Sequence, residues 1–304
     1  MPDGLIVKAL SGFYYVLPQE AGGPGGQVVQ CRAKGIFKKR GITPLVGDRV
    51  TFTPTSHGEG TVDEIKPRIS ELIRPPVANM ELALLVFAVA EPSPSLLLLD
   101  KFLVHTENAG LKAAICLTKT DLLAEPGMED TAARLDEWEA AYREIGYDVL
   151  RCSAKTGEGI DRVLEYLAGR MTVFAGQSGV GKSSLLNRLI PGLDLATNEI
   201  SEKLGRGRHT TRHVELIAHP AGGCIADTPG FSQLDFAGID AERLGSCFVE
   251  IGRMAGDCKF RGCLHLSEPS CAVIAAAESG AIRRSRYEHY LQFLKEITDK
   301  KRRY

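Results

Sequence analysis

The chain has 304 residues, of which 44% are hydrophobic and 25% charged, and its formal net charge is −1. This length predicts two or three domains, and the balanced composition excludes a disordered, fibrous or low-complexity protein. The first residues lack the pattern of a secretory signal, and the longest apolar stretches, 82–90 and 96–99, are separated by Glu-Pro-Ser-Pro-Ser. We therefore expect a cytoplasmic protein without a membrane span.

Both ends of the chain are basic and the middle is acidic. Residues 1–70 carry nine Lys or Arg against six Asp or Glu, residues 71–250 carry 17 against 26, and residues 251–304 carry 11 against six. This distribution favours ends that approach a polyanion, although ordinary solvated charges would also produce it. The candidate contacts are Lys34, Lys38, Lys39 and Arg40, expected in an exposed loop, and Arg283, Arg284 and Arg286 in a basic helical tail.

The first 70 residues predict a small all-β barrel, because short strand-like segments alternate there with turns rich in Gly and Pro. These segments are 5–10, 13–17, 28–32, 49–54 and 60–65.

From about residue 71 the pattern changes to apolar strands alternating with longer helices, which predicts a parallel α/β sheet. The expected strands are 82–90, 113–117, 148–152, 172–175 and 223–226, and the expected helices are 96–109, 131–145, 160–168 and 183–190. Cysteines gather beyond residue 237, and a helical segment, 281–304, closes the chain. The predicted domains are therefore 1–70, 71–236 and 237–304.

The strongest local signal is Gly-Gln-Ser-Gly-Val-Gly-Lys-Ser at 176–183, which fits the phosphate-binding pattern G-x-x-x-x-G-K-[ST] between a strand and a helix. In this pattern backbone N–H groups surround the phosphates, Lys182 reaches the outer phosphates, and the Ser183 hydroxyl binds Mg²⁺. A chance Gly-rich turn would not bring the flanking strand and helix with it. The candidate residues are Gly176, Gln177, Ser178, Gly179, Val180, Gly181, Lys182 and Ser183.

Two earlier segments resemble the motifs with which GTPases bind guanine. Thr118-Lys119-Thr120-Asp121 follows a predicted strand, and a carboxylate at Asp121 can accept hydrogen bonds from the guanine ring N–H and its amine. A polar loop at the end of a strand would give the same four residues. Ser153-Ala154-Lys155 follows the next strand and matches the second guanine motif, so the pair together favours guanine.

Asp-Thr-Pro-Gly at 227–230 resembles the D-x-x-G element of GTPases, in which Asp227 would hold Mg²⁺ through water and the Gly230 N–H would sense the γ-phosphate. A Gly- and Arg-rich segment precedes it, and either Thr210 or Thr211 in that segment would complete the Mg²⁺ shell. In ordinary GTPases the guanine motifs come last, whereas here they precede the phosphate loop. The order predicts a circularly permuted GTPase domain.

Three cysteines and one histidine lie close together near the end of the chain. Cys258, Cys263, His265 and Cys271 match a closed Cys₃His zinc site, which would stabilise a small domain and leave no position open for catalysis. Four buried core residues are the alternative. The remaining cysteines lie mostly in apolar segments and are expected in the core.

A barrel, a permuted GTPase and a Cys₃His module in this order resemble the ribosome-associated GTPase family known as RsgA or YjeQ. The resemblance covers essentially the whole chain and depends on the segments 44–48, 118–121, 176–184 (which adds Ser184), 207–211, 227–231 and the Cys₃His spacing. It implies an OB-fold that contacts ribosomal RNA, a role in late maturation of the small ribosomal subunit, and GTP hydrolysis stimulated by that particle. A monomer is expected.

Phe231 stands where many small GTPases have a water-orienting Gln, so slow hydrolysis without a partner is expected. The resemblance suggests that His209 orients the water, and His213 is a nearby competitor. Two other functions stay open. One is an RNA-binding assembly scaffold whose nucleotide site is conformational, and the other is a GTPase with a protein partner away from the ribosome.

Overall fold

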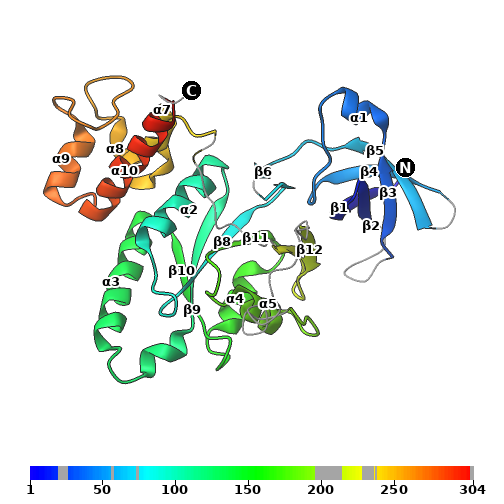
Figure 1. Cartoon of the computed structure of the whole chain (residues 1–304), viewed down its shortest axis with the longest axis horizontal. Coiled ribbons are helices and arrows are strands. Elements are labelled where there is room, and N and C mark those ends of the chain that lie inside the picture. The colour runs from blue at the N-terminus through cyan, green and yellow to red at the C-terminus, as the bar shows by residue number, and fades with distance from the viewer. Residues whose placement is uncertain are drawn as a thin grey trace.

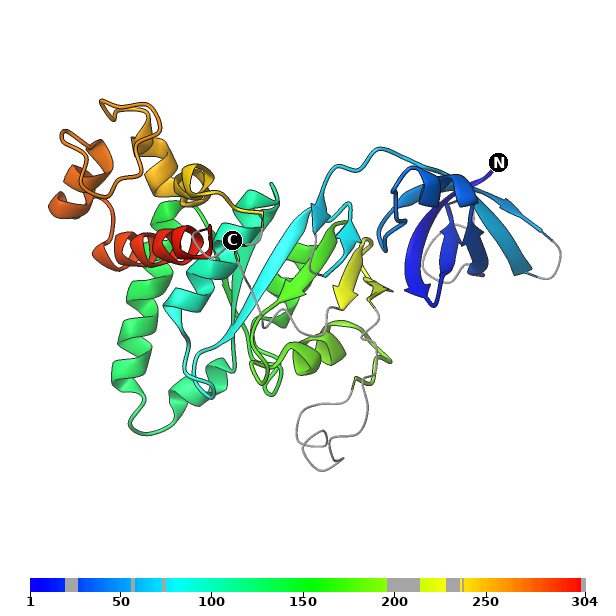
Figure 2. The same cartoon turned by 45° about the horizontal axis from the view of Figure 1, so that its top comes forward.

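Three regions follow one another along the longest axis of the computed structural model (Figures 1 and 2). A barrel lies at one end, an α/β region in the middle and a helical region at the other end. The structure describes residues 1–19, 27–55, 58–72, 75–195, 214–227, 236 and 238–301, with only the backbone at 227 and 301.

The amino-terminal strands close into a five-stranded barrel. Their order is β1-β2-β3-β5-β4, β4 pairs again with β1, and β3–β5 is the parallel pair, which is the topology of an OB-fold. Side chains that alternate along the strands, among them Ile6, Val16 and Phe52, fill the interior. The strands are β1 (Asp3–Leu10), β2 (Phe13–Pro18), β3 (Val29–Ala33), β4 (Arg49–Pro54) and β5 (Glu59–Ile65).

The segment between β3 and β4 is helical, whereas the sequence predicted an exposed loop. Helix α1 (Gly35–Lys39) buries Phe37 against the barrel core and carries Lys38 and Lys39 on its exposed side. The burial of one aromatic side chain explains why this short, polar segment folds as a helix. A small hairpin, β6 (Glu71–Leu72) and β7 (Val77–Ala78), follows the barrel.

The middle region is an α/β sheet with strand order β10-β9-β8-β11-β13-β12, in which β12 alone among the described strands of this region runs antiparallel to its neighbour. At its edge β12 meets β1 of the barrel, where Lys8 pairs with Glu215 at 2.8 Å. The strands are β8 (Leu82–Ala88), β9 (Lys112–Thr118), β10 (Asp148–Arg151), β11 (Met171–Ala175), β12 (Glu215–Ala218) and β13 (Cys224–Asp227).

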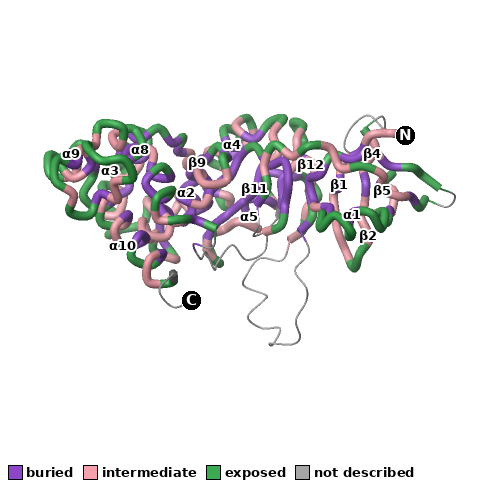
Figure 3. Tube along the Cα trace, turned by 90° about the horizontal axis from the view of Figure 1, so that it is seen from above, coloured by how far each residue is buried: buried purple, intermediate pink, exposed green. Residues whose placement is uncertain are grey.

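Helices cover both faces of this sheet, so its central strands are buried throughout (Figure 3). On β8, Leu85 and Phe87 face the core under two helices, α2 and α3, and Leu84 and Val86 face the core under α4 and α5. This explains the continuous apolar pattern of the sequence there. The helices are α2 (Leu96–Asn108), α3 (Glu129–Ile145), α4 (Ile160–Leu167) and α5 (Lys182–Leu189).

The carboxy-terminal region is helical and has its own core around Phe248, Tyr290 and Phe293, which Val104 of α2 joins. Its helices are α7 (Ala241–Leu244), α8 (Val249–Ala255), α9 (Ala272–Ser279) and α10 (Arg284–Lys301). Among the described helices, none is long and apolar enough to span a membrane.

Arg286 is buried in an ion-pair network between α10 and the α/β region, so its prediction as an exposed contact for a polyanion was wrong. Its guanidinium is 3% exposed and donates to Glu250 at 2.6 and 3.0 Å and to Asp100 at 2.6 Å. Tyr142 and His289 also bind the Asp100 carboxylate, each at 2.6 Å. Asp100 is fully buried, so this network fixes how α10 packs on α2.

Candidate nucleotide and metal sites

The predicted phosphate loop connects β11 to α5, as its pattern requires. Gly176 is needed where the loop leaves the strand, because a Cβ there would lie 2.2 Å from the carbonyl oxygen of Val86. Gly179 and Gly181 have φ values of 81° and 92°, which favour glycine. The loop therefore takes a backbone path that side chains at these positions would block.

The lysine of the loop folds back over it. Lys182 Nζ donates to the carbonyl oxygens of Gly176 and Gln177 at 2.7 and 2.5 Å. Ser183 and Ser184 follow in the first turn of α5 and are half-buried. The N-terminus of this helix and an ammonium group thus lie together, and this combination of groups can bind phosphate.

The first guanine-type motif contacts the phosphate loop directly. Thr118 ends β9, and its hydroxyl oxygen lies 2.5 Å from the carbonyl oxygen of Val180 and 3.2 Å from that of Phe87. Lys119 follows in the left-handed conformation, with φ 60°, and its ammonium group donates to the carbonyl oxygen of Glu91. The base side and the phosphate side of the site are therefore held in one position relative to each other.

The two guanine-type motifs meet at one carboxylate. Ser153 is fully buried, and its hydroxyl donates to Asp121 Oδ1 at 2.6 Å. Lys155 Nζ lies 3.7 Å from Asp121 Oδ2, and the N–H of Thr156 donates to the Ser153 hydroxyl at 3.2 Å. Ala154 lies between Ser153 and Lys155 in the chain. The two loops are also joined by a backbone hydrogen bond of 3.4 Å, from the N–H of Thr120 to the carbonyl oxygen of Cys152. The Asp121 side chain is 14% exposed, so the carboxylate is oriented but can still accept hydrogen bonds.

Several predicted site residues lie outside the described part of the chain. They are His209, Thr210, Thr211, Gly230 and the side chain of Asp227. The backbone of Asp227 ends β13, which lies beside β11 with Ala226 paired to Val173. Asp227, the first residue of the D-x-x-G element, therefore ends the strand next to the one that leads into the phosphate loop.

The four predicted metal ligands come together in the carboxy-terminal region. The ligand atoms of Cys258, Cys263, His265 and Cys271 all lie within 4.8 Å of one another. Sγ of Cys258 is 3.7 Å from Sγ of Cys271 and 3.6 Å from Nδ1 of His265. Tetrahedral ligands about 2.3 Å from a zinc ion would lie about 3.8 Å apart, so the cluster fits zinc.

The loop that carries these ligands is held by residues that the sequence did not point to. The Glu268 carboxylate accepts the N–H groups of Leu264 and Leu266 at 2.8 and 2.7 Å, which holds the pKa of Glu268 near 2 against the cost of its burial. From α10, the Tyr287 hydroxyl donates to the His265 carbonyl oxygen at 2.6 Å and that of Tyr290 to the Leu264 carbonyl oxygen at 2.8 Å.

The other cysteines lie mainly in the core, as expected. Cys31, Cys116, Cys152 and Cys247 are buried and Cys224 is half-buried.

A mainly parallel sheet that carries a phosphate loop and two converging guanine-type loops, with the guanine side first in the chain, defines a circularly permuted P-loop GTPase. Two family models match, "RsgA N-terminal domain" over residues 3–62 and "RsgA GTPase" over residues 65–237. The chain belongs to the RsgA GTPase family.

Similar proteins span the full length of the chain. The small ribosomal subunit biogenesis GTPase RsgA of Bacillus subtilis is 52% identical over 304 residues, and that of Bacillus pumilus is 54% identical over 305, each covering 100% of both chains. Among solved structures, YloQ, a circularly permuted GTPase, is 46% identical with a TM-score of 0.82 and covers 99% of this chain and 96% of its own. YjeQ from Thermotoga maritima is 35% identical with a TM-score of 0.83 and covers 98% of both.

Proposed function

We propose that this GTPase binds the small ribosomal subunit, acts in its late maturation, and hydrolyses GTP in response to that particle. The observation that carries the proposal is the joining of Asp121 to Ser153 and of Thr118 to Val180, because it builds one guanine-nucleotide site from three segments, 118–121, 153–155 and 176–183. The subunit as partner follows from the names of the full-length relatives.

Within this site we propose the following roles. Asp121 accepts the ring N–H and the amine of guanine, Lys119 lies along the base, and Ser153 orients Asp121. Residues 176–184 bind the phosphates through their N–H groups and through Lys182. These assignments imply that GTP binds far more tightly than ATP, and equal competition by ATP would contradict them.

Magnesium would be held by Ser183, by Thr210 or Thr211, and through water by Asp227, and it would neutralise charge on the phosphates. His209 would orient the attacking water, since Phe231 has no polar group to do so. His209→Ala should then slow stimulated hydrolysis and leave GTP affinity unchanged. Loss of GTP binding in this variant would argue against the role.

We propose that the Cys₃His cluster binds one structural zinc ion. The four ligand atoms leave no open position, and the helical region around them is small, so metal binding would contribute directly to its folding. The corresponding domains are 1–70, 71–236 and 237–304, and the protein would act as a monomer in the cytoplasm.

RNA would be contacted from both ends of the molecule. Lys38, Lys39 and Arg40 on and after α1 are exposed, whereas Lys34 pairs with Asp63 at 2.8 Å. In the tail, Arg284 is 89% exposed. The logarithm of the RNA-binding constant falls linearly with the logarithm of the salt concentration. Replacing one phosphate-binding cation with alanine should make this slope less steep by about 0.7 to 0.9.

Phe236 lies shortly after the D-x-x-G element in the chain and packs against helices α2 and α10. Its ring stacks on His105 of α2 at 5.6 Å and packs on Phe293 of α10 at 5.0 Å. The ammonium group of Lys101 lies 4.5 Å from the same ring. We infer that a change at Gly230 reaches α2 and α10 through this anchor, so that GTP and the subunit raise each other's affinity by the same factor.

The test is GTP turnover measured alone and with purified small subunits. Strong stimulation by the subunits is expected, together with tighter binding of the form that carries a non-hydrolysable GTP analogue. Binding without stimulation would instead support a scaffold, and neither binding nor stimulation would support a partner away from the ribosome. Equal subunit affinity of the GDP and GTP-analogue forms would contradict the coupling through Phe236 but not the GTPase activity.

A further inference from the structure

The loop between the first two cysteines of the cluster presents an aromatic ring to solvent. Phe260 is 45% exposed, more than any other aromatic residue in the described part of the chain. It lies two residues after Cys258 and three before Cys263, so residues of the metal cluster hold both ends of its loop. An exposed ring on a constrained loop is a ready-made surface for stacking.

Two cations flank this ring. Lys259 and Arg261 are both exposed, and Lys259 Nζ lies 5.6 Å from the centroid of the Phe260 ring. Within the described ranges neither cation forms an ion pair. The nearby Glu268 carboxylate is occupied by backbone N–H groups of its own loop. An exposed ring with an exposed cation before and after it in the chain is the combination that binds single-stranded nucleic acid, since bases stack on the ring and phosphates bind the cations.

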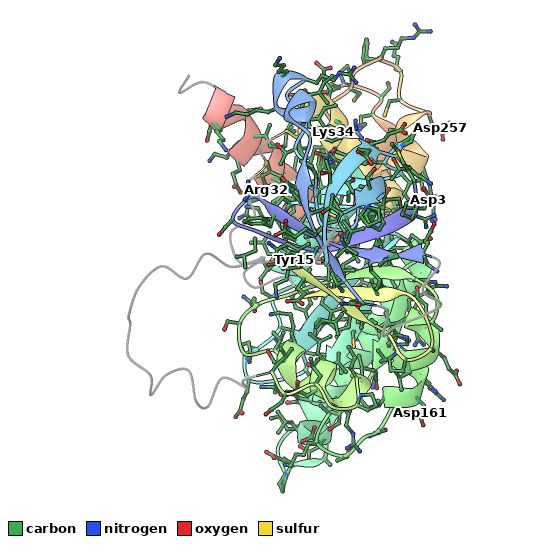
Figure 4. The ribbon with its side chains drawn as sticks, turned by 90° about the vertical axis from the view of Figure 1, so that its right-hand side faces the viewer. Asp3, Tyr15, Arg32, Lys34, Asp161 and Asp257 are labelled. Atoms are coloured by element: carbon green, nitrogen blue, oxygen red, sulfur yellow. The ribbon has the colours of Figure 1, made fainter. Side chains whose placement is uncertain are left out.

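The position of this loop also suits a long polyanion. In Figure 1 the loop between α8 and α9 and helix α1 both lie along the upper edge, at opposite ends of the long axis. Figure 4 labels Lys34 and Asp257, the residues before α1 and before Cys258, and both lie in the upper part of that view. One RNA along this edge would therefore meet the exposed cations of α1 as well as the loop between α8 and α9, to which Phe260 belongs.

We propose that Phe260 stacks on an unpaired RNA base while Lys259 and Arg261 contact the neighbouring phosphates. The bases of a duplex are already stacked, so the site would select a single-stranded loop, bulge or end. Because both ends of the loop are residues of the Cys₃His cluster, little conformational freedom is lost on binding. The proposal rests on the proposed function, since it identifies what part of the particle this region would bind.

The experiment compares three variants of the full chain, Phe260→Ala, Phe260→Tyr and Leu266→Ala. Leu266 is 52% exposed on the same ligand loop and serves as the matched control. The probe is a single-stranded RNA of 12 adenosines, with one 2-aminopurine whose fluorescence falls on stacking. Mass spectrometry of the intact protein first shows equal metal content in all forms. Phe260→Ala should bind the RNA about tenfold more weakly and lose the fluorescence change, whereas Phe260→Tyr and Leu266→Ala keep both.

Equal affinities for Phe260→Ala and Leu266→Ala, or a fluorescence change that persists without the ring, would overturn the proposal. Pelleting with small subunits separates it from the proposed function. If Phe260→Ala weakens subunit binding but not binding of the oligonucleotide, the loop contacts a protein and base stacking is wrong. If the oligonucleotide result holds and subunits do not bind, the stacking site stands and the proposed function fails.

Discussion

Replacement of Arg286 by alanine should destabilise the carboxy-terminal region strongly. The substitution removes three charge-assisted hydrogen bonds and leaves two carboxylates, those of Asp100 and Glu250, buried without their cation. Asp100 is fully buried and Glu250 is 9% exposed, so water cannot replace the guanidinium without rearrangement of α2, α8 and α10. The substitution also takes the guanidinium away from the Phe248 ring, whose centroid lies 4.6 Å from it.

Loss of one partner from such a buried network costs about 3–5 kcal/mol. With a shift of about 2–4 °C per kcal/mol for a protein of this size, the transition of the affected region should fall by roughly 6–20 °C. Arg284→Ala is the matched control, because Arg284 lies on the same helix, is 89% exposed and pairs, among the residues that the structure describes, with Glu288 one turn away. Its substitution should change stability by less than about 0.5 kcal/mol.

Differential scanning calorimetry of the two variants provides the assay, and hydrogen exchange of the α10 amides identifies the region that unfolds. If Arg286→Ala and Arg284→Ala lowered the transition equally, the burial argument would be wrong. In that case Arg286 would be exposed at the surface and could bind a polyanion, as its position in the basic tail of the sequence first indicated.

Asp121→Asn should shift nucleotide preference from guanine toward xanthine, whose base has a carbonyl where guanine has the amine; competition binding measures this, and unchanged preference would refute the assignment of the base site. Cys263→Ala should release metal and destabilise the carboxy-terminal region while GTP affinity stays largely intact; absence of zinc from the parent protein purified without chelator would disprove the metal site. Hydrogen bonds from Lys112 and Tyr166 lower the pKa of Asp148 below its usual 3.8. A lowered folded-state pKa gives stability that is present above the unfolded value and lost as pH falls through the folded one. In urea titrations, the stability difference between the parent and Asp148→Asn should therefore begin to shrink as pH falls below 3.8 and be lost below the lowered pKa of the folded state.

The strands of the barrel and sheet could be predicted because their burial pattern follows directly from their position. The strand at the centre of the sheet is apolar throughout since both faces are covered, and the barrel strands alternate. The phosphate loop could be predicted equally well from the sequence. Its glycines have positive φ values and its lysine follows them at a fixed spacing, a pattern that few structures other than a phosphate-binding loop require.

Features that depend on distant partners could not be predicted in this way. Arg286 looks like any basic residue of a tail, and its burial becomes visible only when Glu250, 36 residues away, and Asp100, 186 residues away, are placed around it. The role of Glu268 depends on three loop N–H groups that face its carboxylate. Helix α1 was missed because one buried phenylalanine within five residues gives too weak a periodicity.

The order of strands in the sheet has a consequence for synthesis of the chain on the ribosome. Strand β8 emerges early and pairs with β9, but its other neighbour, β11, begins at Met171, about 80 residues after β8 ends. At about 5–20 residues per second, one edge of a wholly apolar strand therefore stays unpaired for roughly 4–16 seconds. An unpaired apolar edge favours association with other chains, so synthesis of residues 89–170 is the interval in which this edge is exposed to such association.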